Sequence, residues 1–284
     1  MLIRFLGRKA GAKVLLFFEL TKFFAFFFAE MHFFLYFCTQ IGRMMNDFYS
    51  RSEALLSTRG LEALRTKRVI LFGVGGVGSW AAECLIRTGV VHLTLVDGDT
   101  VQPSNVNRQL PATCATLGRL KVEVLKERLL SIHPEAQITA LPEMVNAEWL
   151  EANGLEGYDY VIDAIDSVND KTDLILYASR VRALKLFCSL GAALRFDPTA
   201  VTTGELMGIK GDALAKAVRA RMKRLDRYPH KKIRCVYSTE QAAVIAKSEG
   251  REATVKGSLM QVTAAFGLTL ASLVINDTYK QIKL

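Results

Sequence analysis

Closely spaced cysteines are absent from this sequence of 284 residues. Its five cysteines lie far apart and no CxxC pair occurs, so the sequence indicates neither a zinc site nor a disulfide framework. Isolated cysteines of this kind are typical of free thiols in a reducing cytoplasm. We therefore expect a cytoplasmic protein without zinc. The five are Cys38, Cys84, Cys114, Cys188 and Cys235.

Phenylalanine is scarce outside residues 1–44, because that extension holds 11 of the 16 in the chain. Within it, residues 14–38 form an apolar run of 25 residues, which is long enough to span a bilayer. Three charged residues interrupt the run, and no small-residue cleavage site of a signal peptide follows it. A membrane anchor and a start assigned too far upstream of Met44-Met45 both remain open, so residues 1–44 are left out of the fold prediction.

Excess positive charge is confined to few places in the remaining chain. The net charge is +9, and residues 210–234 alone hold ten Lys and Arg against Asp212 and Asp226. A local basic patch suits an anionic partner such as a nucleic acid. An ordinary solvated helix face is the alternative interpretation of the same residues.

Short apolar runs alternate with amphipathic segments between residues 68 and 190. We expect strands at 68–72, 91–96, 137–141, 158–162 and 184–190, and helices at 76–87, 119–132 and 171–182. This alternation predicts an α/β fold with a Rossmann-like, doubly wound and mostly parallel sheet. We expect a nucleotide-binding domain over residues 45–192, and a region for substrate binding and interfaces, with a basic helix at 212–225, over residues 193–284.

A second apolar run covers residues 257–275 and contains small residues throughout. Its 19 residues are enough for a membrane helix. However, Gln261 and the small residues favour a helix that packs on the sheet or at a dimer interface. The packed helix is our expectation, and membrane association through residues 14–38 or 257–275 is the alternative.

A glycine-rich turn follows the first expected strand. Gly73, Gly75 and Gly78 form the pattern GxGxxG, with Gly76 between them, and the pattern opens a helix. Such a turn brings a phosphate close to the backbone and to the helix N-terminus. Asp97 ends the next strand, where a carboxylate can bind ribose hydroxyls. This motif alone predicts a nucleotide, with NAD or FAD as the default.

The polar residues after Asp97 change that default. Asn105 and Arg108 are spaced to share one side of a helical turn, and Lys121 lies on the next helix. Cations here suit an enzyme that displaces pyrophosphate, because negative charge develops on the leaving group. Asp166, just past the fourth expected strand, is suited to hold magnesium. Together these residues indicate ATP that is cleaved at its α-phosphate.

Five segments in this order resemble the superfamily of ubiquitin-activating-type adenylating enzymes, the ThiF, MoeB and HesA-like proteins. They are YSR at residues 49–51, GVGGVG, VDGD, SNVNRQ and DAIDS, and the resemblance covers roughly residues 46–192. It implies that ATP, with Mg²⁺, adenylates a carboxylate and releases pyrophosphate.

The same resemblance implies roles for single residues. It implies that Arg51 reaches the γ-phosphate from the neighbouring subunit, and therefore a homodimer. The implied catalytic residues are Arg51, Arg108, Lys121 and Asp166, of which Asp166 binds magnesium. The implied nucleotide-binding residues are Gly73, Gly75, Gly76, Gly78, Asp97, Asp99, Asn105, Arg108, Gln109 and Lys121.

Four further segments resemble the tRNA threonylcarbamoyladenosine dehydratases, which also lack zinc-binding CxxC pairs. They are YSRSEALLSTRGLEALRTKRV, SLGAALRFDPTAV, GDALAKAVRARMKR and KIRCVYSTE. The resemblance implies ATP-dependent closure of a threonylcarbamoyl group to its cyclic form, with tRNA as the partner. The residues expected to bind tRNA are Lys216, Arg219, Arg221, Lys223 and Arg224.

The alternative function is adenylation of the C-terminus of a ubiquitin-like sulfur-carrier protein. Enzymes of that type typically carry two CxxC pairs, which this chain lacks. A thioester mechanism would need a cysteine on a mobile loop. Cys188 is expected to be buried, whereas Cys235 remains a candidate. Helper proteins of the sulfur-transfer type are a further class of partner that the sequence leaves open.

Overall fold

The computed structural model describes residues 48–244 and 256–283. The extension at residues 1–44, with its apolar run, lies outside these ranges. The chain divides into two compact units, Met1–Arg51 and Ser52–Leu284, and the sheet belongs entirely to the second.

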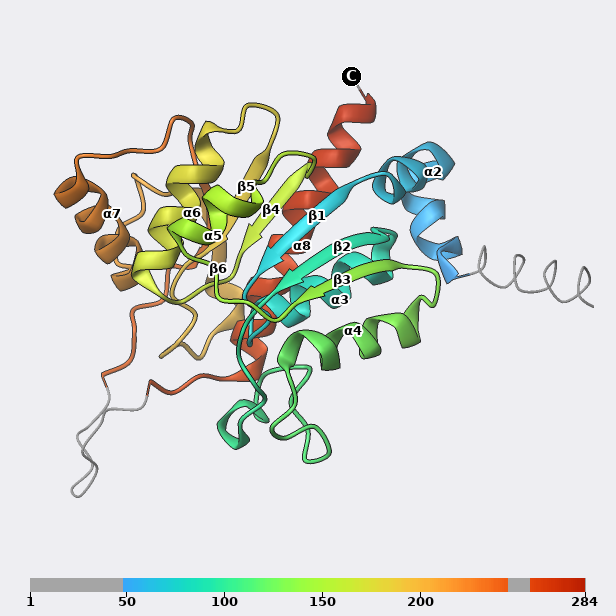
Figure 1. Ribbon diagram of the computed structural model, residues 1–284, viewed down its shortest axis with the longest axis horizontal. Coiled ribbons are helices and arrows are strands. Elements are labelled where there is room, and N and C mark those ends of the chain that lie inside the picture. Colours follow the sequence, from blue (N-terminus) through green and yellow to red (C-terminus); the bar gives the residue numbers. More distant parts are fainter. Residues whose placement is uncertain (1–47, 245–255, 284) are drawn as a thin grey trace, which may run out of the picture. The chain divides into compact units, whose positions relative to one another are not determined.

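A seven-stranded sheet in the order β3-β2-β1-β4-β5-β7-β6 forms the centre of the second unit (Figure 1). All neighbouring strands run parallel except β6 and β7, which pair antiparallel at one edge. The predicted doubly wound, mostly parallel sheet is therefore confirmed. The strands are β1 (Arg68–Phe72), β2 (His92–Val96), β3 (Gln137–Leu141), β4 (Tyr160–Asp163), β5 (Lys185–Ser189), β6 (Val201–Glu205) and β7 (Arg234–Ser238).

Helices cover both faces of this sheet, with α3, α4 and α8 on one side and α5 and α6 on the other (Figure 1). A further helix, α7, packs on the outside of α6. The helices are α2 (Ser50–Arg65), α3 (Gly78–Thr88), α4 (Lys121–Ile132), α5 (Ala147–Asn153), α6 (Val168–Arg180), α7 (Ala213–Leu225) and α8 (Met260–Lys283). Two short 3-10 turns, η1 (Pro103–Asn105) and η2 (Pro198–Ala200), complete the described elements.

Two hydrophobic cores follow from the alternation of side chains along each strand. Val69 and Leu71 join the core under α3, α4 and α8, whereas Ile70 and Phe72 join the core under α6. Because successive strand residues point to opposite faces, a strand buried on both sides reads as a continuous apolar run. This is why RVILF at β1 was recognisable in the sequence.

Four helices and strands were absent from the sequence-based prediction: α2, α5, β6 and β7. β6 has the sequence VTTGE and only half-buried or exposed residues, so it carries no apolar run. It pairs with β7, and a pairing between strands that are distant in the sequence cannot be predicted from the local residue pattern. Both strands lie beyond residue 192, and they extend the same sheet that β1 to β5 begin.

The apolar run at residues 257–275 forms most of α8, and its small residues allow close packing on α3. A Cβ added to Gly267 would lie 2.8 Å from Trp80 Cβ and 2.9 Å from Ala81 N, and would also collide with the Val77 carbonyl oxygen. Phe266 and Leu270 are fully buried in the core beneath. The prediction of a packed helix is confirmed. None of the helices in residues 48–244 and 256–283 combines the length and the hydropathy that a membrane span requires.

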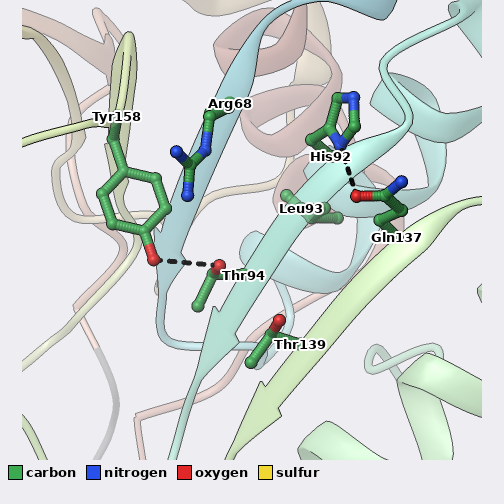
Figure 2. Close-up of a pocket in the computed structure, with 7 residues that line it drawn as sticks. All are labelled: Arg68, His92, Leu93, Thr94, Gln137, Thr139 and Tyr158. Carbon is green, nitrogen blue, oxygen red and sulfur yellow. Dashed lines mark hydrogen bonds between the residues drawn. The ribbon is translucent and has the colours of Figure 1, made fainter.

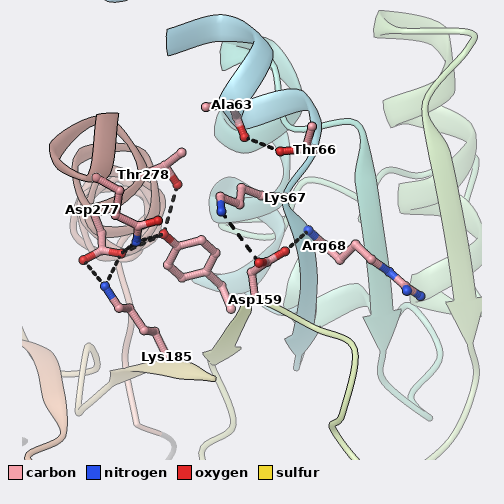
Figure 3. Close-up of polar contacts among 10 residues, drawn as sticks. Ala63, Thr66, Lys67, Arg68, Asp159, Lys185, Asp277 and Thr278 are labelled. Atoms are coloured by element: carbon pink, nitrogen blue, oxygen red, sulfur yellow. Dashed lines mark hydrogen bonds and ion pairs between the residues drawn. The ribbon is translucent and has the colours of Figure 1, made fainter. Parts of the chain in front are cut away.

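Polar contacts fix the far end of α8 to the sheet (Figure 3). Both carboxylate oxygens of Asp277 accept hydrogen bonds from Lys185 Nζ at 2.7 Å, and Tyr160 Oη donates to Asp277 at 2.7 Å. Burial raises the pKa of the Tyr160 phenol well above its ordinary value, and Asp277 raises it further. These contacts hold α8 over the starts of β4 and β5.

Gly267→Ala is expected to lower the free energy of unfolding by about 1–3 kcal/mol, because the added methyl group would force α3 and α8 apart. Thermal unfolding followed by circular dichroism measures this. Gly257→Ala is the matched control, since nothing lies within 4 Å of a Cβ added there. Equal melting temperatures for the two variants would contradict the close packing.

Candidate nucleotide-binding active site

The strand order reverses direction between β1 and β4, which are neighbours in the sheet. In doubly wound sheets, ligands bind outside the carboxyl ends of the strands at this switch point. The turn after β1 and the loop after β4 both leave the sheet there. The predicted site residues of these loops therefore share one edge of the sheet.

Glycines at both ends of the turn are required by its geometry. Gly73 has φ of 84°, and a Cβ on it would lie 2.8 Å from the Ala164 carbonyl oxygen. A Cβ on Gly78 would lie 2.9 Å from Leu71 Cδ2 and would collide with the Gly73 carbonyl oxygen. The turn can close only with these two residues, as expected for the first and third positions of the motif.

The start of α3 is open to an anion. Val77 is the N-cap and forms no side-chain capping bond, and no acidic residue occupies the first turn. The N–H groups at such an end attract a phosphate. A Cβ on Gly75 would lie 3.6 Å from Gln109 Nε2, and Gln109 Oε1 is buried without a hydrogen-bond partner among the described residues. Oε1 can accept a hydrogen bond from a donor group of a ligand, whereas Nε2, which lies beside Gly75, can donate one.

Asp97 is held in place by two backbone amides. Its Oδ2 accepts from Val74 N at 2.8 Å, and its Oδ1 accepts from Asp99 N at 2.9 Å. Burial raises the pKa of the Asp97 carboxyl, while Lys121 and the two amides oppose that rise. Each oxygen keeps a lone pair free, so the carboxylate can also accept from ribose hydroxyls.

Arg108 packs across the glycine turn. A Cβ added to Gly76 would lie 3.1 Å from Arg108 Cγ. Arg108 Nη1 donates to the Ser104 carbonyl oxygen and to Asn107 Oδ1, both at 2.8 Å, and the guanidinium forms no ion pair with a described residue. Trp80 Nε1 donates to the Arg108 carbonyl oxygen at 3.1 Å. The side chain therefore brings an unneutralised positive charge to the turn.

Asn105 and Lys121 are positioned by contacts within the protein. Asn105 Oδ1 accepts from Gln102 N at 3.0 Å and closes the turn at η1, and its Nδ2 has no partner among the described residues. Lys121 is 7% exposed and its Nζ lies 2.6 Å from Asp99 Oδ2. The lysine carries a buried charge beside Asp97 with one acidic partner.

Asp166 is exposed in the loop that follows β4. Two contacts of Asp163 shape the loop that carries it. Asp163, the last residue of β4, forms an ion pair of 2.7 Å with Lys171, and both side chains are 0% exposed. Asp163 Oδ1 also accepts from Ile165 N at 3.0 Å, which shapes the loop that presents Asp166.

The C-terminal helix contributes contacts that sequence reasoning missed. Thr263, in the first turn of α8, lies beside Gly76, with 3.4 Å between Thr263 Cβ and a Cβ built on the glycine. Asn107 Nδ2 donates to the Ser258 carbonyl oxygen at 2.9 Å, and Leu194 N donates to the Gly257 carbonyl oxygen at 2.8 Å. The small residues of the apolar run were the available signal, because they allow a close helix approach.

The basic residues predicted to bind ATP or tRNA differ in their exposure and in their contacts with the protein. Arg51 is exposed and belongs to the first unit, whereas the site is built from the second. On α7, Arg219 Nη1 donates to the Leu206 carbonyl oxygen at 2.8 Å, and Arg221 pairs with Asp173 at 3.2 Å. Three predicted tRNA-binding residues keep exposed side chains that have no such partner among the described residues: Lys216, Lys223 and Arg224.

The two cysteines considered for a thioester are both fully buried on strands. Cys188 on β5 lies in register with Cys235 on β7, and each is 0% exposed. Burial raises the pKa of the Cys188 thiol well above its ordinary value. Cys235 is therefore not on a mobile loop, and the structure gives no support to a thioester at either position.

A separate polar pocket of about 310 Å³ lies on the α6 side of the sheet, near the starts of β1, β2 and β3 (Figure 2). Tyr158 and Thr94 meet there, with 3.1 Å between their hydroxyl oxygens, and the Arg68 guanidinium lies 5.6 Å from the centre of the Tyr158 ring. None of the predicted site residues lines it. The glycine turn lies at the opposite ends of the strands.

Comparison with known proteins shows which family has these features. The sequence model of the ThiF family matches residues 49–281. The chain belongs to the ThiF family. The tRNA threonylcarbamoyladenosine dehydratases of Haemophilus influenzae and Bacillus subtilis are each 35% identical to this ThiF-family chain, and the matches cover 80% and 83% of it and 91% and 96% of those proteins.

Solved structures agree with the sequence relatives. The E. coli tRNA N6-threonylcarbamoyladenosine dehydratase TcdA in complex with AMP superposes with a TM-score of 0.76 at 34% identity, covering 84% of this ThiF-family chain and 96% of that one. The same enzyme in complex with ATP gives a TM-score of 0.75 at 33% identity and the same coverage. The E. coli molybdopterin-synthase adenylyltransferase is 36% identical, but over only 49% of this chain and 54% of its own.

Two glycines of the turn are expected to respond differently to alanine. Gly78→Ala should lower the melting temperature, because its methyl group meets the backbone of Gly73. Gly75→Ala should fold normally, because its nearest neighbour is Gln109 Nε2 at 3.6 Å, yet bind ATP at least about tenfold more weakly, because the methyl group occupies the phosphate approach. Calorimetric ATP titration and thermal unfolding separate the two effects. Normal ATP affinity in Gly75→Ala would refute this location of the phosphate.

Proposed function

We propose that this chain uses ATP to convert threonylcarbamoyladenosine in tRNA to its cyclic, dehydrated form. The observation that carries the proposal is the extent of the similarity. Matches to tRNA threonylcarbamoyladenosine dehydratases cover about four fifths of the chain, including the basic helix, whereas the match to a carrier-protein adenylyltransferase covers about half.

The reaction has two steps. A carboxylate oxygen of the threonyl group attacks the α-phosphorus of ATP, a new O–P bond forms, and the bond to the β-phosphate breaks to release pyrophosphate. A nucleophilic atom of the carbamoyl group then attacks the activated carbonyl carbon, which closes the ring and releases AMP. Positioning and charge neutralisation supply most of the catalysis in steps of this kind.

The residues around the glycine turn fit ATP in these roles. The open N–H groups of α3 and the Nε2 amino group of Gln109 are suited to the phosphates, and Asp97 to the ribose. Arg108 and Lys121 oppose the negative charge that develops on the leaving pyrophosphate. We assign magnesium to Asp166, because its exposed carboxylate follows β4 at the same edge of the sheet.

We further infer that the enzyme works as a homodimer. The inference rests on Arg51, which is exposed in the structure and which the family resemblance assigns to the γ-phosphate of the neighbouring subunit. For the tRNA we assign α7, whose Lys216, Lys223 and Arg224 face solvent. Arg219 and Arg221 serve instead to hold α7 to the loop at Leu206 and to α6.

Arg108→Ala is expected to abolish formation of the cyclic nucleoside and release of pyrophosphate, because the leaving group loses its cation. The measurement is mass spectrometry of nucleosides from substrate tRNA incubated with ATP and purified enzyme. Lys280→Ala, which removes an exposed cation at the other end of α8, should act like the wild type. Pyrophosphate exchange that needs a carrier protein and ignores tRNA would favour the alternative function.

Removal of Lys216, Lys223 or Arg224 should weaken tRNA binding without changing ATP affinity. Each substitution by alanine is expected to reduce the slope of log affinity against log salt by about one, as for any phosphate contact. Filter binding at several salt concentrations measures the slope, with Lys280→Ala as the control. An unchanged slope in all three variants would place the tRNA elsewhere.

A further inference from the structure

We propose that a surface pocket at the C-terminal end of α7 binds an unpaired base of the tRNA. The pocket has a volume of about 400 Å³, and its walls include Tyr228, His230, Lys232 and Glu205. It adjoins the exposed cations of α7 and lies outside the nucleotide site. The inference rests on the proposed function, because it names a second point of contact for the same tRNA.

The loop that forms the pocket is anchored to the body of the protein. Asp226 adopts a left-handed conformation with φ of 50° and ends α7. His230 N donates to Ser179 Oγ at 3.1 Å. Lys231 Nζ donates to the Val181 carbonyl oxygen at 2.9 Å and also to that of Leu184, and burial lowers the pKa of this lysine. The intervening side chains are therefore displayed from a fixed backbone.

The side chains on this loop suit a nucleobase. Tyr228 is 49% exposed, and His230 and Lys232 are also exposed. RNA-binding proteins recognise unpaired bases by stacking them on aromatic rings of this kind, with cations nearby for the phosphates.

An acidic residue of the pocket lining, Glu205, supplies a contact for the edge of the base. Glu205 Oε2 accepts from Met207 N at 3.1 Å and from Gly208 N at 3.2 Å. Its other oxygen has no partner among the described residues, so it can accept from an exocyclic amino group. Such an arrangement favours a base with an amino group over uracil.

The pocket is remote from the chemistry. The N-cap of α7, Asp212, accepts a hydrogen bond from Gly191 N just past the end of β5, at the edge of the sheet that carries the nucleotide site. The loop that forms the pocket ends just before Arg234, where β7 starts, at the opposite edge of the sheet. With 13 residues, α7 spans about 20 Å between them. The pocket therefore acts on tRNA affinity and leaves the chemical step unchanged.

The test compares three substitutions at Tyr228 in the full-length enzyme. Tyr228→Ala and Tyr228→Leu should raise both the Kd and the KM for tRNA about 10- to 100-fold, the range found when one stacked base is lost. Tyr228→Phe, which keeps the ring, should stay within about threefold of the wild type. In all three, kcat at saturating tRNA, the ATP affinity and the melting temperature should match the wild type.

Two outcomes overturn the proposal. Wild-type tRNA affinity in Tyr228→Leu would show that the ring does not stack on a base. Normal activity of all three variants with purified tRNA, together with loss of cyclisation in cells, would assign the pocket to a protein partner. The proposed function fails separately, if the wild-type enzyme makes no cyclic nucleoside; filter binding of tRNA to Tyr228→Ala still tests the pocket in that case.

Discussion

The close approach of α3 and α8 at Gly267 is the contact on which the site depends. Because Gly267 has no side chain to hold α8 away from α3, the first turn of α8 reaches the glycine turn. Two helix N-termini from distant parts of the sequence therefore meet beside Gly76, and both favour negative charge. The C-terminal third of the chain therefore lies against the glycine turn, and it also carries α7, the helix that we propose for the tRNA.

Much of the fold was predictable, because the strands that are buried on both faces leave continuous apolar runs. All five predicted strands exist, with ends within two residues of the structure. α6 begins at Val168, three residues before the predicted start, since Ser167 caps it. β6 was missed because its residues are half-buried or exposed and so form no apolar run. Its pairing with β7 depends on contacts made only in the folded chain.

The site was predictable where a motif fixes both residue type and spacing, as at Gly73, Gly78 and Asp97. The glycine positions follow from backbone collisions, so chemistry and geometry agree. The sequence could not distinguish between cations that face solvent and cations that hold the protein together. Arg221 has the same character as Lys223 in the sequence, yet it pairs with Asp173 on α6, and only the three-dimensional arrangement reveals this.

The ion pair of Asp163 and Lys171 ties the end of β4 to α6 with both charges removed from solvent. Loss of either partner leaves an isolated charge in the interior, which costs several kcal/mol, about 3–5. Replacement of both together by apolar residues of similar volume avoids that cost. Substitutions at the two positions are therefore expected to be strongly non-additive, so that in evolution the pair is kept or replaced together.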